Sequence, residues 1–354
     1  MIYVHKISLV IHTASQDDFL KNQGIDSYFE NICINLNRQT HKSFELIYVD
    51  SYYDENKEKF DTIFPKHAII VKHVPLHQNH RYWYDRGGTY ISAAKNTGIL
   101  YADGELIVSI DDAEFMPDDL LERYWQHFQT KHYMLGLHKR LKNIIASDGK
   151  INFPIRGDEY INDHRFLSMD QDIVRHENGV NAFAGTSFSL KDALILNGFN
   201  EMMDGCKSLE DCDFGFRLQK LGRKFAFDKN GFVYILDHQS YTDRKINTGW
   251  EQAQEIQETN VEPPKKVKKP VESIVCVENY GVHMFAVQLH QLRVNCYDLN
   301  QQHYDILQRE TIRYRNFDPL AESNSEKFEM WKNVPKFNLE EERILLRKEN
   351  WRFG

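Results

Sequence analysis

The stretch SAAKNTGILYADGELIVSIDDAEFMPDDLL, residues 92–121, decides the fold prediction because it joins a helix, a strand and a second helix start. Small residues and helix formers fill residues 92–102. After a turn at Asp103 and Gly104, ELIVSID is the apolar run expected of a buried strand. Pro117 suits the first turn of the following helix. A helix leading directly into such a strand predicts one unit of a parallel sheet covered on both faces.

The same alternation continues on both sides of this stretch. Apolar side chains recur at helical spacing over residues 28–36, and LEDCDFGFRLQKLG predicts a helix closed by Gly222. Further strands are predicted at ISLVIHT (7–13), FELIYVD (44–50), HAIIVKHV (67–74), FAGTSFSL (183–190), KFAFD (224–228) and FVYILDH (232–238). Ligands of parallel α/β sheets bind at the carboxyl ends of the strands, where Asp50 and Asp111 stand.

Other segments are less regular. Residues 138–180 are polar, and we expect an insertion or a mobile loop there. The chain is predicted to form a domain over residues 1–250, followed by a linker at 251–270, where a double proline meets a basic cluster. Residues 271–354 are predicted to form a small C-terminal α+β extension of unknown role, with a hairpin at 273–289 and a short helix beginning near Asn338.

Composition favours a globular cytoplasmic protein. The 354 residues carry a formal charge of −8, which argues against broad non-specific binding of nucleic acid. The five cysteines are scattered without a CxxC pair, which is typical of a reducing compartment. We find no signal-peptide pattern and no apolar run of about 18 residues. The lysines at 265, 266, 268 and 269 indicate either a solvated linker or contact with an anionic acceptor or a membrane surface.

Two acidic clusters are the candidates for chemistry. Asp111, Asp112 and Glu114 follow a buried strand, and such carboxylates either bind Mg²⁺ or Mn²⁺ or favour the next helix start. Glu210 and Asp211 begin a predicted helix, so they either stabilise its N-terminus or supply a general base. At the end of FVYILDH, His238 is either a structural residue or a metal ligand.

The order and spacing of four blocks resemble family 2 glycosyltransferases of the GT-A fold, over roughly residues 5–240. The blocks are SLVIHTAS, RQTHKSFELIYVDSYYDE, SAAKNTGILYADGELIVSIDDAEFMPDDLL and NAFAGTSFSLKDALILNGFNE followed by LEDCDFGFRLQKLG. The resemblance implies an α/β, Rossmann-like, mostly parallel sheet flanked by helices. It also implies transfer of a sugar from a nucleotide-diphosphate donor, most commonly a UDP-sugar, by metal-dependent inverting displacement.

The resemblance also implies roles for single residues. Thr13 and Ser15 match the loop that contacts the nucleotide, with Ser15 in place of the usual Asn. Asp50 matches the contact to the base. Lys95 stands where Arg is usual, so it keeps the positive charge for the diphosphate without a bidentate fork.

On the same matching, Asp211 is the catalytic base, with Glu210 beside it to orient or tune it, and His238 is a metal ligand in some members. Asp111 and Asp112 fall on the metal motif, where Asp111 also contacts the nucleotide sugar.

The metal motif departs from the family pattern at one position. Ala113 stands where an acid is typical, and Glu114 follows one residue later. Either Glu114 substitutes as a ligand, so that Asp112 and Glu114 form a D-x-E motif, or fewer protein ligands hold Mn²⁺ or Mg²⁺.

Two alternative functions remain open. The chain could be a nucleotidyltransferase acting on sugar phosphates, which would release pyrophosphate instead of a nucleoside diphosphate. It could also be a non-catalytic carbohydrate-binding relative, for which Ala113 is the hint. The acceptor is open among a sugar, a lipid-linked sugar, a protein and a modified nucleic acid.

Overall fold

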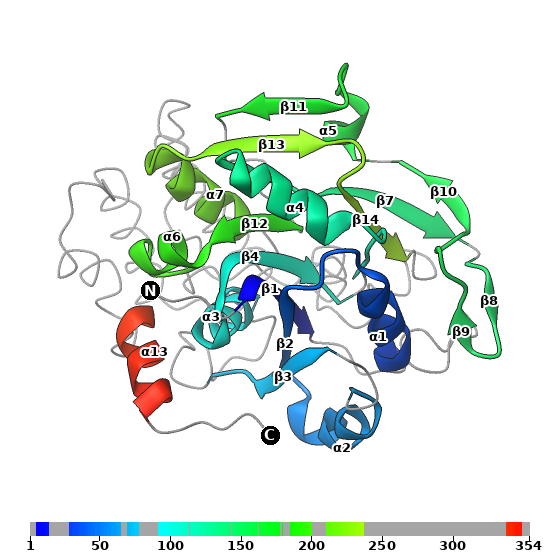
Figure 1. Cartoon of the computed structure of the whole chain (residues 1–354), viewed down its shortest axis with the longest axis horizontal. Coiled ribbons are helices and arrows are strands. Elements are labelled where there is room, and N and C mark those ends of the chain that lie inside the picture. Colours follow the sequence, from blue (N-terminus) through cyan, green and yellow to red (C-terminus); the bar gives the residue numbers. More distant parts are fainter. Residues whose placement is uncertain are drawn as a thin grey trace, which may run out of the picture.

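The computed structural model describes residues 5–13, 28–64, 69–77, 91–112, 114–142, 144–161, 163–177, 179, 185–199, 210–236 and 338–348. Its central element is a five-stranded sheet with strand order β12-β4-β1-β2-β3 (Figure 1). The first four strands along the chain run parallel, and β12 is antiparallel to β4. The bounds are β1 (His5–Thr13), β2 (Phe44–Asp50), β3 (Ile70–Pro75), β4 (Gly104–Asp111) and β12 (Thr186–Ser189).

The core of this sheet agrees with the apolar runs of the sequence. Every residue of β2 is buried, and the side chains of β1 and β4 are buried on both faces of the sheet. Helix α3 packs closely on β1, because a Cβ at Gly98 would lie only 2.3 Å from Cγ1 of Val10. The helices are α1 (Tyr28–Arg38), α2 (Tyr53–Ile63), α3 (Ile91–Tyr101), α4 (Leu120–Gln129), α5 (His164–Leu167), α6 (Leu190–Ile195) and α7 (Glu210–Lys220). The predicted α/β fold class is confirmed.

Of the two interpretations of residues 138–180, the mobile loop is wrong, and the insertion stays a prediction. This segment contributes strands to three small sheets, with orders β10-β7-β14-β5, β11-β13-β6 and β8-β9. The bounds are β5 (Glu114–Phe115), β6 (His132–Met134), β7 (Leu137–Lys142), β8 (Ala146–Ser147), β9 (Lys150–Ile151), β10 (Asp158–Tyr160), β11 (Ile173–His176), β13 (Lys224–Asp228) and β14 (Phe232–Leu236). The reason is visible in β7, LHKRLK, whose middle residues are half-buried and polar, so that no apolar run marks the strand.

Two predicted helix ends are confirmed. Gly222 has a φ of +73° after α7, and its N–H donates to the carbonyl of Gln219 at 2.8 Å. The C-terminal helix α13 (Leu339–Lys348) begins after Asn338, whose Oδ1 accepts from the backbone N–H groups of Glu340 and Glu341 at 3.0 and 3.2 Å. The predicted hairpin at 273–289 lies outside the described residues, and the domain boundaries stay predictions.

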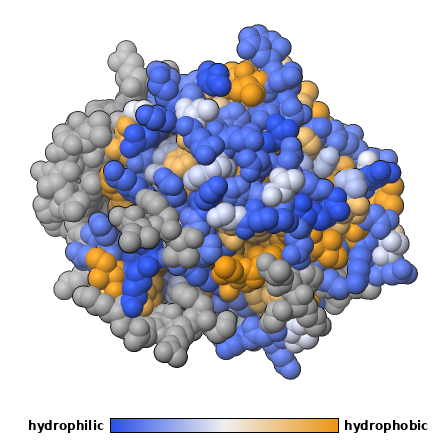
Figure 2. All heavy atoms as spheres, viewed as in Figure 1, coloured by the Kyte–Doolittle hydropathy of each residue, from blue (hydrophilic) through white to orange (hydrophobic). Residues whose placement is uncertain are grey.

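The surface in view is mainly hydrophilic, with smaller apolar patches between the polar residues (Figure 2). Large apolar side chains that remain exposed are Ile70, Ile145, Leu167, Ile173, Ile344 and Leu345. Within the described ranges, no helix combines the length and apolar character needed to cross a membrane.

Candidate functional site

The carboxyl ends of three parallel strands meet at one edge of the central sheet. In the strand register, Thr13 at the end of β1 is level with Asp50 at the end of β2. On the other side of β1, His12 is level with Asp111 at the end of β4. The structure therefore brings Thr13, Asp50 and Asp111 to one edge, as the sequence predicted.

The acidic residues after β4 take two different orientations. The Asp111 side chain is 47% exposed, and Asp112 Oδ2 accepts a hydrogen bond from Thr13 Oγ1 at 2.8 Å. Glu114 is only 1% exposed, because it lies in β5 and its Oε2 accepts from the backbone N–H of Asp111 at 2.9 Å. Asp111 is thus the exposed carboxylate, Asp112 is half-buried against Thr13, and the buried Glu114 holds the backbone of the turn.

The surroundings of Glu114 disfavour its ionised form. Burial is the main cause that raises the pKa of Glu114 well above its ordinary value, and the Asp111 carboxylate adds to the rise. Oε1 of Glu114 is buried without a hydrogen-bond partner among the described residues. Glu114 would have to turn outward to bind a cation, so its role as a ligand stays a prediction.

An ion pair between α3 and α7 joins the two acidic clusters. Lys95 Nζ donates to Glu210 Oε1 at 2.9 Å, and both side chains are buried. Burial opposes the charge on Lys95, but Glu210, Asp211 and Asp111 outweigh it and raise the pKa of Lys95 above its ordinary value. The Lys95 ammonium also lies 5.1 Å from the centroid of the Phe199 ring. Lys95 is therefore held as a cation between the start of α7 and the end of β4.

Asp211 is the next residue of α7 after Glu210 and is half-buried. Since its carboxylate contributes to the raised pKa of Lys95, it belongs to the same electrostatic cluster. It lies in the first turn of α7, at the helix end that carries partial positive charge.

Asp50 is buried and is held by three neighbouring groups. Its Oδ1 accepts from the backbone N–H of Tyr52 at 2.7 Å, and its Oδ2 lies 3.0 Å from both Asn56 Nδ2 and His73 Nε2. These contacts fix the carboxylate at the end of β2, and the proposed contact with a nucleotide base stays a prediction.

His12 is a site residue that the sequence reasoning missed. Its Nε2 lies 3.4 Å from Asp111 Oδ1, and its buried Nδ1 has no hydrogen-bond partner among the described residues. Burial lowers the pKa of His12 although Asp111 opposes this, so a neutral imidazole stands beside the first aspartate. His12 could have been found from its place next to Thr13 at the end of β1, because β1 pairs with β4, which ends at Asp111.

Asp111 and Asp112 are the described residues that could hold a cation. The Asp111 side chain is 47% exposed, and Asp112 Oδ2 is bonded to Thr13. The described residues contain no group of three or more His, Cys, Asp or Glu side chains arranged to hold a metal. Mg²⁺ and similar ions often use one or two protein carboxylates together with water and substrate phosphates. Binding of a cation by Asp111 and Asp112 therefore stays a prediction.

Two further predicted site residues, Ser15 and His238, lie outside the described residues. The placement of His238 relative to Asp111 and Asp112 therefore stays a prediction.

Comparison with known proteins identifies a family that matches part of the chain. Residues 31–144 match the model of the family described as "Glycosyl transferase family 2". The chain carries a family 2 glycosyltransferase domain. Glycosyltransferase GlyG of Streptococcus pneumoniae serotype 4 (strain ATCC BAA-334 / TIGR4) is 24% identical over 217 residues, which are 60% of this chain and 68% of the relative. This glycosyltransferase domain includes β2, α3, β4 and the turn that presents Asp111 and Asp112.

Solved structures of S. aureus TarS also resemble the chain. TarS 1-349 is 14% identical with a TM-score of 0.45, and the match covers 99% of this glycosyltransferase chain and 93% of TarS 1-349. TarS 1-349 in complex with UDP-GlcNAc is 13% identical with a TM-score of 0.43, covering 93% and 82% of the two chains.

Proposed function

We propose that this glycosyltransferase moves a sugar from a nucleoside diphosphate donor, with a UDP-sugar as the first candidate, to an acceptor hydroxyl with inversion at the anomeric carbon. The observation that carries the proposal is the buried ion pair between Lys95 and Glu210. It fastens α3 to α7 beside the acidic turn after β4, so the two acidic clusters frame one site.

The charge of the site supports a divalent cation. Carboxylates outnumber the ammonium group there, since Lys95 is surrounded by Glu210, Asp211 and Asp111. A diphosphate would add more negative charge to this edge. Mn²⁺ or Mg²⁺ held by Asp111 and Asp112 would neutralise the departing diphosphate when bound. The Lys95 ammonium would support the same phosphates electrostatically.

Asp211 is the residue to which we assign the base. Glu210 already accepts a hydrogen bond from Lys95, so it serves better to hold the lysine than to take up a proton. Asp211 would take the proton of the acceptor hydroxyl. The hydroxyl oxygen bonds to the anomeric carbon as the bond to the diphosphate oxygen breaks, and the nucleoside diphosphate leaves.

The remaining site residues would bind the nucleotide. Thr13, the last residue of β1, already holds Asp112 by a hydrogen bond, and we propose Ser15 as a second contact to the nucleotide. Asp50 would accept a hydrogen bond from a ring N–H of the base. Because the Asp50 side chain is fully buried and already contacts Tyr52, Asn56 and His73, this contact would require neighbouring side chains to move and uncover the carboxylate.

A donor screen tests the proposal. Purified protein is incubated with nucleoside diphosphate sugars with and without Mn²⁺, and the released nucleotide is identified. We expect a free nucleoside diphosphate, with release that depends on the cation. Pyrophosphate would instead show nucleotidyl transfer, and absence of turnover with every donor would indicate a non-catalytic relative.

A pair of variants tests the base. Asp211→Asn should lower transfer to an acceptor by about 100-fold or more, which is the usual contribution of a general base. Asp170→Asn, a change at an exposed aspartate outside the site, serves as the matched control. Transfer by Asp211→Asn near the wild-type rate would refute the assignment. The acceptor classes to screen are sugars, lipid-linked sugars, proteins and modified nucleic acids.

A further inference from the structure

Helix α13 lies against α3, the helix that carries Lys95 (Figure 1). One face of α13 is buried through Leu339 and Arg343, whereas Ile344 and Leu345 are exposed. The contact is therefore made by a defined face of α13.

Arg343 binds the C-terminal end of α3. Its Nη1 donates to the carbonyl oxygens of Ile99 and Leu100 at 3.0 and 2.8 Å. Carbonyls in the last turn of a helix lack partners within the helix, and a cation there also suits the helix dipole. Burial and the neighbouring Arg347 lower the pKa of Arg343 to about 10, so the group stays charged at neutral pH. Arg343 thus acts as a cap on α3 supplied from a distant part of the chain.

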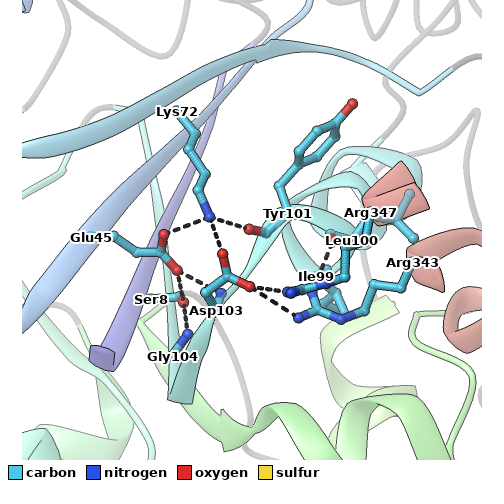
Figure 3. Close-up of polar contacts among 10 residues, drawn as sticks. All are labelled: Ser8, Glu45, Lys72, Ile99, Leu100, Tyr101, Asp103, Gly104, Arg343 and Arg347. Atoms are coloured by element: carbon cyan, nitrogen blue, oxygen red, sulfur yellow. Dashed lines mark hydrogen bonds and ion pairs between the residues drawn. The ribbon is translucent and has the colours of Figure 1, made fainter. Parts of the chain in front are cut away.

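A charge network at the same end of α3 depends on α13 (Figure 3). Lys72 Nζ lies 2.8 Å from Glu45 Oε2 and 2.7 Å from Asp103 Oδ2. Arg343 Nη2 lies 3.4 Å from Asp103 Oδ1, and Arg347 contacts the same oxygen. Without α13, one lysine would face two carboxylates in a mostly buried place. The buried Arg343 therefore offsets the second carboxylate where α3 turns into β4, and the more exposed Arg347 adds a further positive charge.

A second contact of α13 reaches the turn after α6. The backbone N–H of Leu339 donates to Asn197 Oδ1 at 2.9 Å. The Leu339 side chain packs on Gly198, where an added Cβ would lie 2.4 Å from Leu339 Cδ1 and 2.2 Å from Asn96 Oδ1. Leu339 and Asn96 thus enclose this turn from two sides.

The same turn, after α6, contacts the part of α3 that carries Lys95. Phe199 N donates to Asn96 Oδ1 at 2.7 Å, and Asn96 Nδ2 donates to the Phe199 carbonyl at 2.9 Å. The Phe199 ring lies 5.1 Å from the Lys95 ammonium. Helix α13 therefore contacts α3 in two ways. Arg343 binds the C-terminal carbonyls of α3, and Leu339 packs on the turn that is bonded to Asn96, the residue next to Lys95.

We propose that helix α13 positions Lys95 for the transfer reaction, with Arg343 and Leu339 as the positioning residues. The inference rests on the proposed function in that Lys95 is taken to support the donor diphosphate. Lys95 and Leu100 are separated by about 7.5 Å along the axis of α3, at 1.5 Å per residue. A rigid helix transmits a displacement over that distance, so release of Arg343 moves the lysine relative to Glu210.

The first test measures the position of Lys95 directly. Native protein is treated briefly with an amine-acetylating reagent, and labelling of each lysine is quantified by mass spectrometry, with exposed Lys150 as internal standard. We expect Arg343→Ala and Leu339→Ala to raise Lys95 labelling about fivefold or more. Arg343→Lys should restore part of the protection, because it keeps the charge.

Leu345→Ala is the matched control, since it makes the same deletion on the exposed face of the same helix. Hydrogen exchange over residues 339–348 and 91–101 shows whether α13 has been released. If α13 is released and Lys95 labelling stays at the wild-type level, the inference is wrong.

The second test separates positioning from general stability. Arg343→Ala should raise the donor KM by about 3- to 10-fold at a temperature where the protein is folded. In a Lys95→Met background the same change should add less than about twofold, because its effect passes through the lysine. Full additivity would overturn the inference. If the wild-type protein turns over no donor, the proposed function fails, whereas the labelling experiment still decides whether α13 positions Lys95.

Discussion

Glu210→Gln removes the negative partner of Lys95 and leaves the ammonium group buried. The two charged atoms are 2.9 Å apart, and the side chains are 6% and 8% exposed. At that separation and an effective dielectric constant of about 20, the gross attraction is about 6 kcal/mol. Desolvation offsets part of it, and Asp211 and Asp111 still attract the lysine. We therefore expect the free energy of unfolding to fall by about 3 kcal/mol.

A double-mutant cycle with Lys95→Met isolates the pair. The double variant has no unpaired buried charge, so it should lose only about 1 kcal/mol, and the coupling energy should be at least about 2 kcal/mol. Urea denaturation followed by circular dichroism and tryptophan fluorescence measures each variant. Because the pKa of Lys95 is raised, the coupling is fully present below the ordinary lysine pKa of about 10.4 and is lost only as the pH rises through the raised value.

The exposed pair Lys150–Glu30 is the matched control for this cycle. Its atoms are 2.6 Å apart, but its side chains are 49% and 38% exposed, so its coupling should stay below about 1 kcal/mol. A Lys95–Glu210 coupling within about 0.5 kcal/mol of zero would refute the reasoning, since it would mean that burial adds nothing to the pair.

Three further changes have defined outcomes. Asp103→Asn should cost about 2 kcal/mol at pH 7, because burial opposes ionisation but Lys72 holds the pKa of Asp103 below its ordinary value; as the pH falls below about 3.8, denaturation curves of variant and wild type should converge. Gly198→Ala should lower the free energy of unfolding by about 3 kcal/mol, since the φ of Gly198 is +70° and the added methyl group would lie 2.2 Å from Asn96 Oδ1. Gly222→Ala is its control, because Gly222 has a φ of +73° but an added Cβ would meet nothing within 4 Å, so the loss should be only about 1 kcal/mol. Equal urea midpoints for the two variants would contradict this reasoning. Thr13→Val removes the hydrogen bond to the Asp112 carboxylate and should raise the donor KM about tenfold in steady-state assays; an unchanged KM would exclude a part for this bond in donor binding.

The sequence was sufficient to predict a strand where apolar residues make up most of that strand. FELIYVD is buried at every position and forms β2 at the predicted residues 44–50, because a strand covered on both faces needs a mostly apolar run; the two acids, Glu45 and Asp50, have partners in Lys72 and in Asn56 and His73. LHKRLK forms β7 at an interior position of its small sheet, yet its half-buried histidine, lysine and arginine interrupt any apolar run. Such a strand is defined by its neighbour β14, which is distant in the sequence.

The site was predicted by position more successfully than by orientation. The family pattern placed Lys95 and Glu210 in one site, but their direct contact spans 115 positions and no local pattern indicates it. Glu114 was expected beside a metal, whereas its carboxyl group fastens the backbone of Asp111. His12 was missed because its significance comes from the register between β1 and β4, which a single strand does not reveal.

The cap that Arg343 places on α3 has a consequence for biosynthesis. Arg343 and the Leu100 carbonyl that it binds are 243 positions apart. At about 5–20 residues per second, a ribosome needs roughly 12 to 50 s to make the intervening chain. During that interval, the nascent protein has Glu45 and Asp103 opposite Lys72, and the last carbonyls of α3 lack this partner. The period in which this end of α3 is open to chaperones is therefore set by translation of the residues between Leu100 and Arg343, and synonymous codons there should change the yield of folded enzyme.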